Sequence, residues 1–209
     1  MNPEMITGVP ERRCAELAGR SDADIGGELL GRLAVHSAVD HDTLARWADS
    51  ALTFGRELAA TANGNPDLDV TERTGGVEPG RRILLAEYRS RPAGVVVYTD
   101  AVERAESLID EVGWREWYPA GSVRAAAVAH ETAHQLLHGP AATRLRRRVG
   151  KVALRLGSWT VHAHVVGAPE LAAHGFAAAA AGLARTPVLL TAALGELAAA
   201  LRHPAERDV

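Results

Sequence analysis

The chain has 209 residues, 47% of them hydrophobic, and a formal net charge of −3. This length and composition predict one folded domain with a sizeable core and exclude a disordered chain. The slightly negative charge argues against a nucleic-acid-binding protein and against a protein of the membrane surface.

Cys14 is the only cysteine. The chain therefore has neither an internal disulfide framework nor a cysteine-based zinc site. Its first residues lack the charged start and apolar run of a secretory signal, and its apolar stretches are too short to span a bilayer. These features predict a cytoplasmic protein.

The first part of the chain reads as a loose segment followed by helix. Residues 1–22 show no firm period and are expected to be loosely ordered, whereas residues 23–204 are expected to form the single domain. Leucines at helical spacing favour helix over residues 24–62. The turn compositions of residues 63–69 and 74–80 then predict loops.

The middle of the chain contains the one convincing sheet. Residues 83–89 and 95–99 are rich in β-forming side chains, and "SRPAG" between them suits a hairpin turn. A helix is expected over residues 100–113, with Asp100 as its N-cap and Glu103 completing a capping box.

Three further helices follow. Ser122 can cap a helix over residues 123–138, and Thr186 can cap one over residues 187–202, with another over residues 169–183. The fold class predicted from this order is α+β, mostly helical, with a small antiparallel hairpin beside the central helix.

A basic stretch separates these helices. Read as a helix, it places Arg144, Arg148, Lys151 and Arg155 on one face, which is expected to be a solvated face, with an acidic partner or DNA as the alternative. The alternating residues 160–166 read as a strand.

The central segment "VAHETAHQLLHG" (128–139) contains a His-Glu-x-x-His motif. On a helix, His130 and His134 lie one turn apart and can each direct one nitrogen to a single tetrahedral ion. Glu131 then points toward metal-bound water and can accept its proton as the general base. The alternative is a helix whose histidines are satisfied by ordinary hydrogen bonds.

A catalytic zinc ion needs a third protein ligand. The metzincin extension is excluded because Leu137 and Pro140 occupy its glycine and histidine positions, and His138 lies one turn too far along the helix. Glu170, in the first turn of the helix over residues 169–183, is the preferred third ligand, with His174 at i+4 as the alternative.

"AHETAHQLLHG" followed by "ELAAHGFAAAAAGL" resembles the ImmA/IrrE-like metallopeptidases, which are small gluzincins. The resemblance covers roughly residues 80 to 185, although His174 stands where asparagine is common in the second motif. It implies a minimal zincin-like fold, a glutamate ligand on the second helix, and a hairpin strand beside the cleft. Residues 83–89 or 95–99 would then hold an extended peptide by backbone hydrogen bonds.

The function expected from these motifs is that of a zinc-dependent intracellular peptidase, with another divalent transition metal as an option. A small-molecule substrate, bound in a pocket lined by Trp114, Trp117 and Tyr118, is the first alternative. A non-catalytic metal-binding regulatory protein is the second. A peptide or protein substrate is expected, with neither a membrane nor a nucleic-acid partner, and the oligomeric state is left open.

Weaker candidates surround this prediction. Tyr98, Tyr118, His162 and His164 are considered as groups that could stabilise an oxyanion, although each is expected to be a packing or surface residue.

Overall fold

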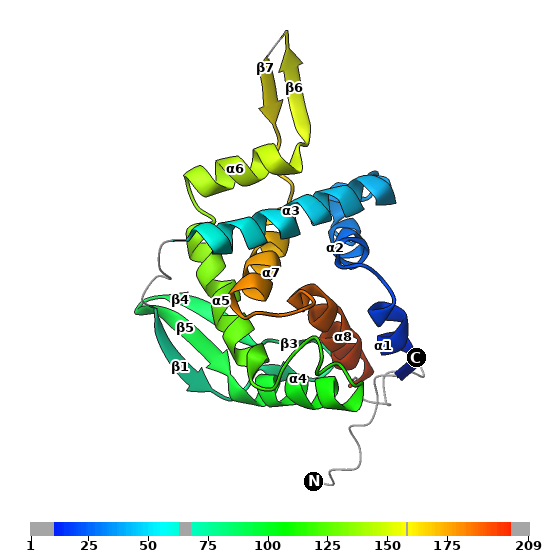
Figure 1. The fold of residues 1–209 in the computed structure, drawn as a ribbon, viewed down its shortest axis with the longest axis vertical. Helices are drawn as coiled ribbons and strands as arrows, with labels where there is room; N and C mark the ends of the chain where they lie inside the picture. The colour runs from blue at the N-terminus through cyan, green and yellow to red at the C-terminus, as the bar shows by residue number, and fades with distance from the viewer. Residues whose placement is uncertain (1–10, 63–67, 158, 202–209) are drawn as a thin grey trace.

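The computed structural model describes residues 11–62, 68–157 and 159–201. They form a mostly helical α+β fold with small sheets, which confirms the predicted fold class (Figure 1). The helical elements are α1 (Glu11–Ala18), α2 (Asp22–Gly31), the 3-10 turn η2 (Ala34–His36), α3 (His41–Thr61), α4 (Thr99–Glu111), α5 (Ser122–Leu136), α6 (Pro140–Val149), α7 (Ala168–Ala180) and α8 (Pro187–Ala200). The strands are β1 (Asp69–Arg73), β2 (Val77–Glu78), β3 (Arg82–Ile83), β4 (Ala86–Ser90), β5 (Ala93–Tyr98), β6 (Val152–Leu156) and β7 (Trp159–His162).

Part of the N-terminal segment expected to be loosely ordered is helical. Residues 1–10 lie outside the described residues, as do residues 202–204 of the expected domain. Helix α1 begins at Glu11, and its Cys14 is buried in the main hydrophobic core. Helix α1 packs against α8, so residues 11–18 belong to the folded body.

The helical stretch expected over residues 24–62 is two helices separated by a turn. Helix α2 ends at Gly31, and α3 starts after Asp40, whose carboxylate accepts a hydrogen bond from the Thr43 N–H at 2.8 Å. This N-cap satisfies one of the backbone donors at the start of α3 and fixes where that helix begins.

Helices α3 and α7 cross at the centre of the molecule, with α3 lying against α7 (Figure 1). Gly55 and Gly175 make this crossing close: a Cβ atom on Gly55 would lie 1.9 Å from the Ala172 carbonyl oxygen, and one on Gly175 would lie 2.0 Å from that of Leu52. The position of α7 is therefore set by backbone-to-backbone contact with α3.

The main sheet has the strand order β1-β5-β4. The predicted hairpin is present as β4 and β5, which pair antiparallel, and Val95, Val96 and Val97 of β5 are buried. The sheet is mixed, however, because β1 adds to β5 in parallel. Strand β1 lies almost entirely between the two predicted loops and was missed because "DVTER" has no run of apolar side chains.

The predicted capping box at residue 100 is wrong. Helix α4 begins at Thr99, and Tyr98 is its N-cap without a side-chain hydrogen bond. The Asp100 carboxylate instead accepts hydrogen bonds from the backbone N–H groups of Gly75, Gly76 and Val77 at 3.0, 3.1 and 3.3 Å. It thereby ties the segment before β2 to the start of α4.

The basic stretch is not one helix, so the predicted common face of its cations is wrong. Helix α6 ends at Val149, Gly150 follows with a φ of 76°, and β6 starts at Val152. Glycine adopts this left-handed conformation without strain and ends the helix. Strands β6 and β7 pair as an antiparallel hairpin that projects from the body beyond α6 (Figure 1). No helix among the described residues combines the length and the hydrophobicity needed to cross a bilayer.

Candidate metal centre

Helix α5 carries the His-Glu-x-x-His motif and packs against α7. Its buried positions include Ala126, Ala129 and Ala133. Small side chains on a helix allow the neighbouring helix to approach closely. The polar residues of α5 and α7 consequently meet across this contact.

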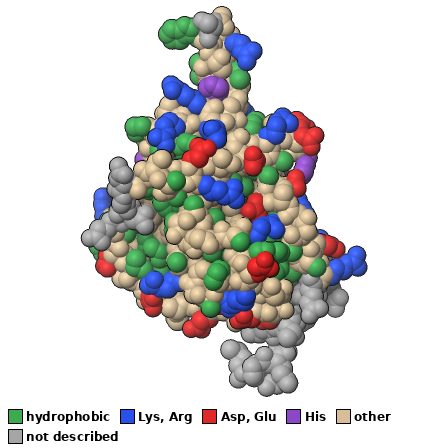
Figure 2. Space-filling model, viewed as in Figure 1, with side chains coloured by type: hydrophobic (Ala, Val, Ile, Leu, Met, Phe, Trp, Pro, Cys, Tyr) green, Lys and Arg blue, Asp and Glu red, His purple; other side chains and the backbone are tan. Residues whose placement is uncertain are grey.

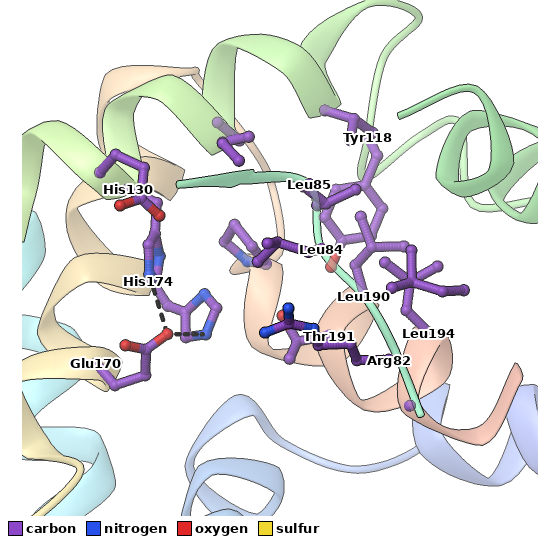
Figure 3. A pocket seen from close by; sticks show the side chains of 18 of the residues that line it. Arg82, Leu84, Leu85, Tyr118, His130, Glu170, His174, Leu190, Thr191 and Leu194 are labelled. Carbon is purple, nitrogen blue, oxygen red and sulfur yellow. Dashed lines mark ion pairs between the residues drawn. The ribbon is translucent and has the colours of Figure 1, made fainter. Parts of the chain in front are cut away.

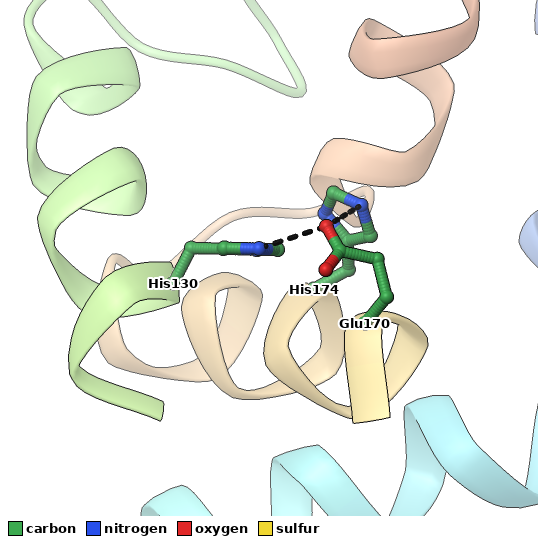
Figure 4. A group of neighbouring side chains, drawn as sticks. All are labelled: His130, Glu170 and His174. Carbon is green, nitrogen blue, oxygen red and sulfur yellow. Dashed lines mark ion pairs between the residues drawn. The ribbon is translucent and has the colours of Figure 1, made fainter. Parts of the chain in front are cut away.

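Three of the predicted ligands converge on one point. The Nε2 atoms of His130 and His134 lie 3.1 Å apart, and Nε2 of His130 lies 3.0 Å from Oε1 of Glu170. Nε2 of His134 lies 3.2 Å from Oε2 of the same carboxylate. Figure 4 shows the His130 ring pointing from α5 toward Glu170 on α7.

His174, the alternative ligand, belongs to the same cluster. Its Nε2 atom lies 3.8 Å from Oε1 of Glu170, and its ring lies 4.6 Å from that of His130, centroid to centroid. One donor atom from each of His130, Glu170 and His174 falls within 4.8 Å of the others. The structure therefore places both candidates for the third ligand, Glu170 and His174, in one cluster.

The electrostatics of the cluster depend on its burial and its ion pairs. Burial lowers the pKa of His174 to about 3, aided by the nearby His130, so that this imidazole is neutral at physiological pH. Burial also opposes ionisation of Glu170, but the hydrogen bonds from His130 and His134 outweigh it and hold the pKa of Glu170 well below its usual range. The hydrogen bond to Glu170 raises the pKa of His134.

These residues fit a transition-metal ion. Bond lengths of 2.0–2.1 Å in a tetrahedral zinc site place ligand atoms about 3.4 Å apart, close to the 3.0, 3.1 and 3.2 Å found here. Two imidazoles and a carboxylate are also a donor set that zinc prefers. In addition, Nδ1 of His174 is buried without a hydrogen-bond partner among the described residues. A buried polar atom without a hydrogen-bond partner costs free energy, and such a cost is common where a side chain is positioned for binding or catalysis.

Glu131, next to the ligand cluster on α5, also contacts the sheet. Its Oε2 atom accepts a hydrogen bond from the Tyr88 N–H of β4 at 3.0 Å. Burial raises the pKa of Glu131, against the lowering effect of His130 and His134. A carboxylate with a raised pKa is a stronger base than an exposed one, as a general base for water activation requires.

Strand β4 presents its free edge to α5. The Tyr98 N–H donates to the Leu85 carbonyl, so the ladder bonds to β5 fall at every second residue from Leu85 onward. The backbone groups of Ala86 and Tyr88 therefore point away from β5. Strand β5 is paired on both sides, so β4, rather than residues 95–99, is the strand that has a free edge at the site.

A cavity of about 320 Å³ opens beside the cluster. His130, Glu131, Glu170 and His174 line one end of it. The rest of its wall is mostly apolar and comes from the segment before β4, from α5 and from α8; it includes Leu84, Leu85, Ala126, Leu190 and Leu194 (Figure 3). The leucines of α8 could not be assigned to a site from the sequence, because α8 is apolar on nearly every face.

The aromatic residues proposed to wall a small-molecule pocket are mostly elsewhere. Trp114 is buried in the core, and the ring of Trp117 lies 5.2 Å from the guanidinium of Arg185. Tyr118 lines the cavity, but its hydroxyl donates to the Thr186 carbonyl at 2.8 Å. Its O–H group is therefore committed to the core.

The remaining candidates lie outside the cavity. His138 is exposed beyond the end of α5, which stops at Leu136 and is thus shorter than predicted. His162 ends β7 and pairs with Val152, while His164 follows the strand and faces α6. Tyr98 is not among the residues that line the cavity.

Comparison with known proteins gives no relative for this chain. No family model matches this chain, and no curated protein and no solved structure is detectably similar to it.

Proposed function

We propose that this protein is a zinc-dependent hydrolase whose substrates are peptides. The observation that carries the proposal is the convergence of His130, His134 and Glu170 from two helices, with donor atoms 3.0–3.2 Å apart. Since no family match supports it, the proposal depends on these side chains and on the cavity beside them.

His130, His134 and Glu170 would hold the metal, with His174 in contact with them. A bound zinc ion supplies a Lewis acid that lowers the pKa of a coordinated water molecule to about 7. Glu131 takes the proton of the attacking water, and its raised pKa suits it to pass that proton to the leaving amine.

The neighbouring strand supports a peptide as the substrate. The outward-facing backbone of Ala86 can pair with an extended chain, since β4 is an edge strand next to the cluster. The apolar wall formed by Leu84, Leu190 and Leu194 favours a peptide with a large apolar side chain near the cleaved bond. The lone Cys14 suits a reducing compartment, and we infer a cytoplasmic location.

The experiment compares the purified wild type with Glu131→Gln on a mixture of peptides, with and without added zinc. We expect zinc-dependent cleavage that falls at least 100-fold in Glu131→Gln, while the zinc content stays the same. Glu116→Gln is the matched control, because the same isosteric change at an exposed position should leave the rate unchanged. Equal rates for wild type and Glu131→Gln would refute the proposed role of Glu131.

His174 favours a second candidate, a metal-binding regulatory protein without turnover. If its imidazole joins His130, His134 and Glu170, four protein ligands complete a tetrahedral shell and leave no position for water. A chain that binds zinc tightly, loses it on His174→Phe substitution and cleaves neither peptides nor small amides would support this candidate.

A further inference from the structure

The β6–β7 hairpin carries an exposed apolar face. Its cross-strand pairs are Leu156 with Trp159 and Leu154 with Val161, so these four side chains share one face of the ribbon. Trp159 is 79% exposed and Leu156 is 64% exposed. Apolar side chains gathered at the end of a projecting element mark an interaction surface (Figure 2).

Positive charge lies on α6 at the base of this hairpin and continues along β6 as far as Arg155. No Asp or Glu occurs between Glu131 and Glu170, whereas the same stretch contains six basic residues: Arg144, Arg146, Arg147, Arg148, Lys151 and Arg155. We call these six residues the basic collar. Figure 2 shows blue side chains on the body beneath the hairpin.

Little of this charge is neutralised by ion pairs. Within the described part of the chain, the one ion pair of the basic collar joins Arg148 to Glu57 at 2.6 Å. Arg144 and Lys151 lie over aromatic rings, which leaves their charge in place. The collar therefore presents several unneutralised cations next to an apolar tip.

The apolar tip and the basic collar together favour one kind of partner over the others. A second copy of the chain would bring its own basic collar against this one, so like charges would repel. A β-ribbon that reads DNA needs polar side chains on the face that enters the groove, whereas this face consists of Leu, Val and Trp. An anionic bilayer offers both phosphate groups for the collar and an apolar layer for the tip.

We propose that the β6–β7 hairpin inserts its apolar face into the surface of an anionic lipid bilayer, with the basic collar on the headgroups. Strands of four and five residues are about 13–17 Å long. That length lets Leu156 and Trp159 reach the acyl boundary, about 5–10 Å deep, while α6 stays at the headgroups. Tryptophan is a side chain preferred at this boundary.

This peripheral attachment needs no membrane-spanning helix. It differs from the expectation of no membrane partner, which depended on the lack of spanning segments and on the net charge of the whole chain. It does not depend on the metal centre, since none of the hairpin residues lines the cavity.

The test is co-sedimentation of the full chain with vesicles of phosphatidylcholine, either alone or with about one third phosphatidylserine. We expect binding to the anionic vesicles that weakens with salt, and little binding to the neutral ones. Trp159→Ala should lower the partition coefficient at least about 10-fold. Arg147→Gln/Arg155→Gln should lower it about 20- to 30-fold, as expected for two cations near the surface.

Arg12→Gln/Arg13→Gln is the matched control. It removes the same charge from exposed α1, which lies at a distance from the hairpin, and should change the partition coefficient less than about 3-fold (Figure 1). The emission of Trp159, obtained as the difference between the wild type and Trp159→Phe, should shift to the blue on vesicle binding. Because the hairpin is exposed, these variants should keep the thermal stability of the wild type.

Three results would overturn the proposal. The first is a wild type that stays in the supernatant with anionic vesicles. The second is equal sedimentation of the wild type and Trp159→Ala. The third is a dimer that forms without lipid and that Trp159→Ala dissociates, which would assign the hairpin to contact between two copies.

Discussion

Substitution of Gly175 by alanine should push α7 away from α3. The added Cβ atom would lie 2.0 Å from the Leu52 carbonyl oxygen and 2.8 Å from its carbon. Real Cβ contacts are at least 3.0 Å long, so α7 must move by about 1 Å or more relative to α3. The neighbour is backbone, which cannot rotate aside as a side chain would.

The loss of stability in Gly175→Ala can be estimated. Overpacking of a core costs about 1–3 kcal/mol, and a clash with backbone belongs at or above the upper end of this range. The gain in helix propensity from glycine to alanine returns about 1 kcal/mol. We therefore expect Gly175→Ala to lower the free energy of unfolding by at least about 2 kcal/mol. The same movement displaces Glu170, which now lies 3.0 Å from His130, and should weaken zinc binding.

Gly195→Ala is the matched control for this experiment. Gly195 is also helical, but a Cβ atom there meets nothing within 4 Å, so the substitution should stabilise the protein by about 0.5–1 kcal/mol. Urea denaturation and zinc titration measure both effects. A Gly175→Ala variant as stable as the wild type, with unchanged zinc affinity, would refute the proposed close contact between α3 and α7.

Three further predictions concern the surroundings of the site. Asp100→Ala should lower the free energy of unfolding by about 2 kcal/mol at neutral pH. Backbone hydrogen bonds such as that from the Gly76 N–H outweigh partial burial and hold the pKa of Asp100 below its usual value, so this stabilisation is present above about pH 4 and is lost as the pH falls through the lowered pKa. The urea midpoints of variant and wild type should therefore converge in acid, and a constant gap would contradict the assignment. Leu190→Trp should fill the cavity and slow cleavage of peptides with large apolar side chains at least about 10-fold without changing zinc content, and equal rates on all peptides would argue against this cavity as the substrate site. Tyr118→Phe should lower stability by about 1–2 kcal/mol, because the Thr186 carbonyl loses its donor, and should leave the cleavage rate within about 3-fold; a loss of rate without a loss of stability would instead place the Tyr118 hydroxyl in catalysis.

The sequence predicted the helices of the site because their signals are local, although the predicted side-chain caps are wrong: Gly121, not Ser122, is the N-cap of α5, and Thr186 caps α8 without a side-chain hydrogen bond. The spacing of His130 and His134 follows from helix geometry, and Pro169 and Pro187 mark the first turns of α7 and α8. The sequence also led us to expect Glu170 near His130 and His134. That His174 joins the same cluster follows from the packing of α5 against α7.

Features that depend on tertiary contact could not be predicted in this way. Strand β1 has little strand signal of its own and is held by pairing with the buried strand β5. Asp100 matches a capping box in sequence, but three backbone donors from residues 75–77 compete for its carboxylate and bind it. The contact between Glu131 and the Tyr88 N–H joins two elements 43 residues apart, and no local pattern encodes it.

The basic stretch shows how one glycine changes the outcome. A helical period across residues 144–155 was plausible from the charges alone, yet Gly150 ends α6 and the chain turns into a hairpin. The alternation of Val152, Leu154 and Leu156 is the strand signal that competed with the helical one.

The central claim is tested most directly by measuring the bound zinc of the wild type beside Glu170→Ala and His174→Ala, with Glu116→Ala as the control. The account predicts one zinc ion per chain in the wild type and in the control, and an affinity at least about 100-fold lower in Glu170→Ala. A wild type that takes up no zinc, or a Glu170→Ala variant that binds it as tightly as the wild type, would contradict the proposed metal centre.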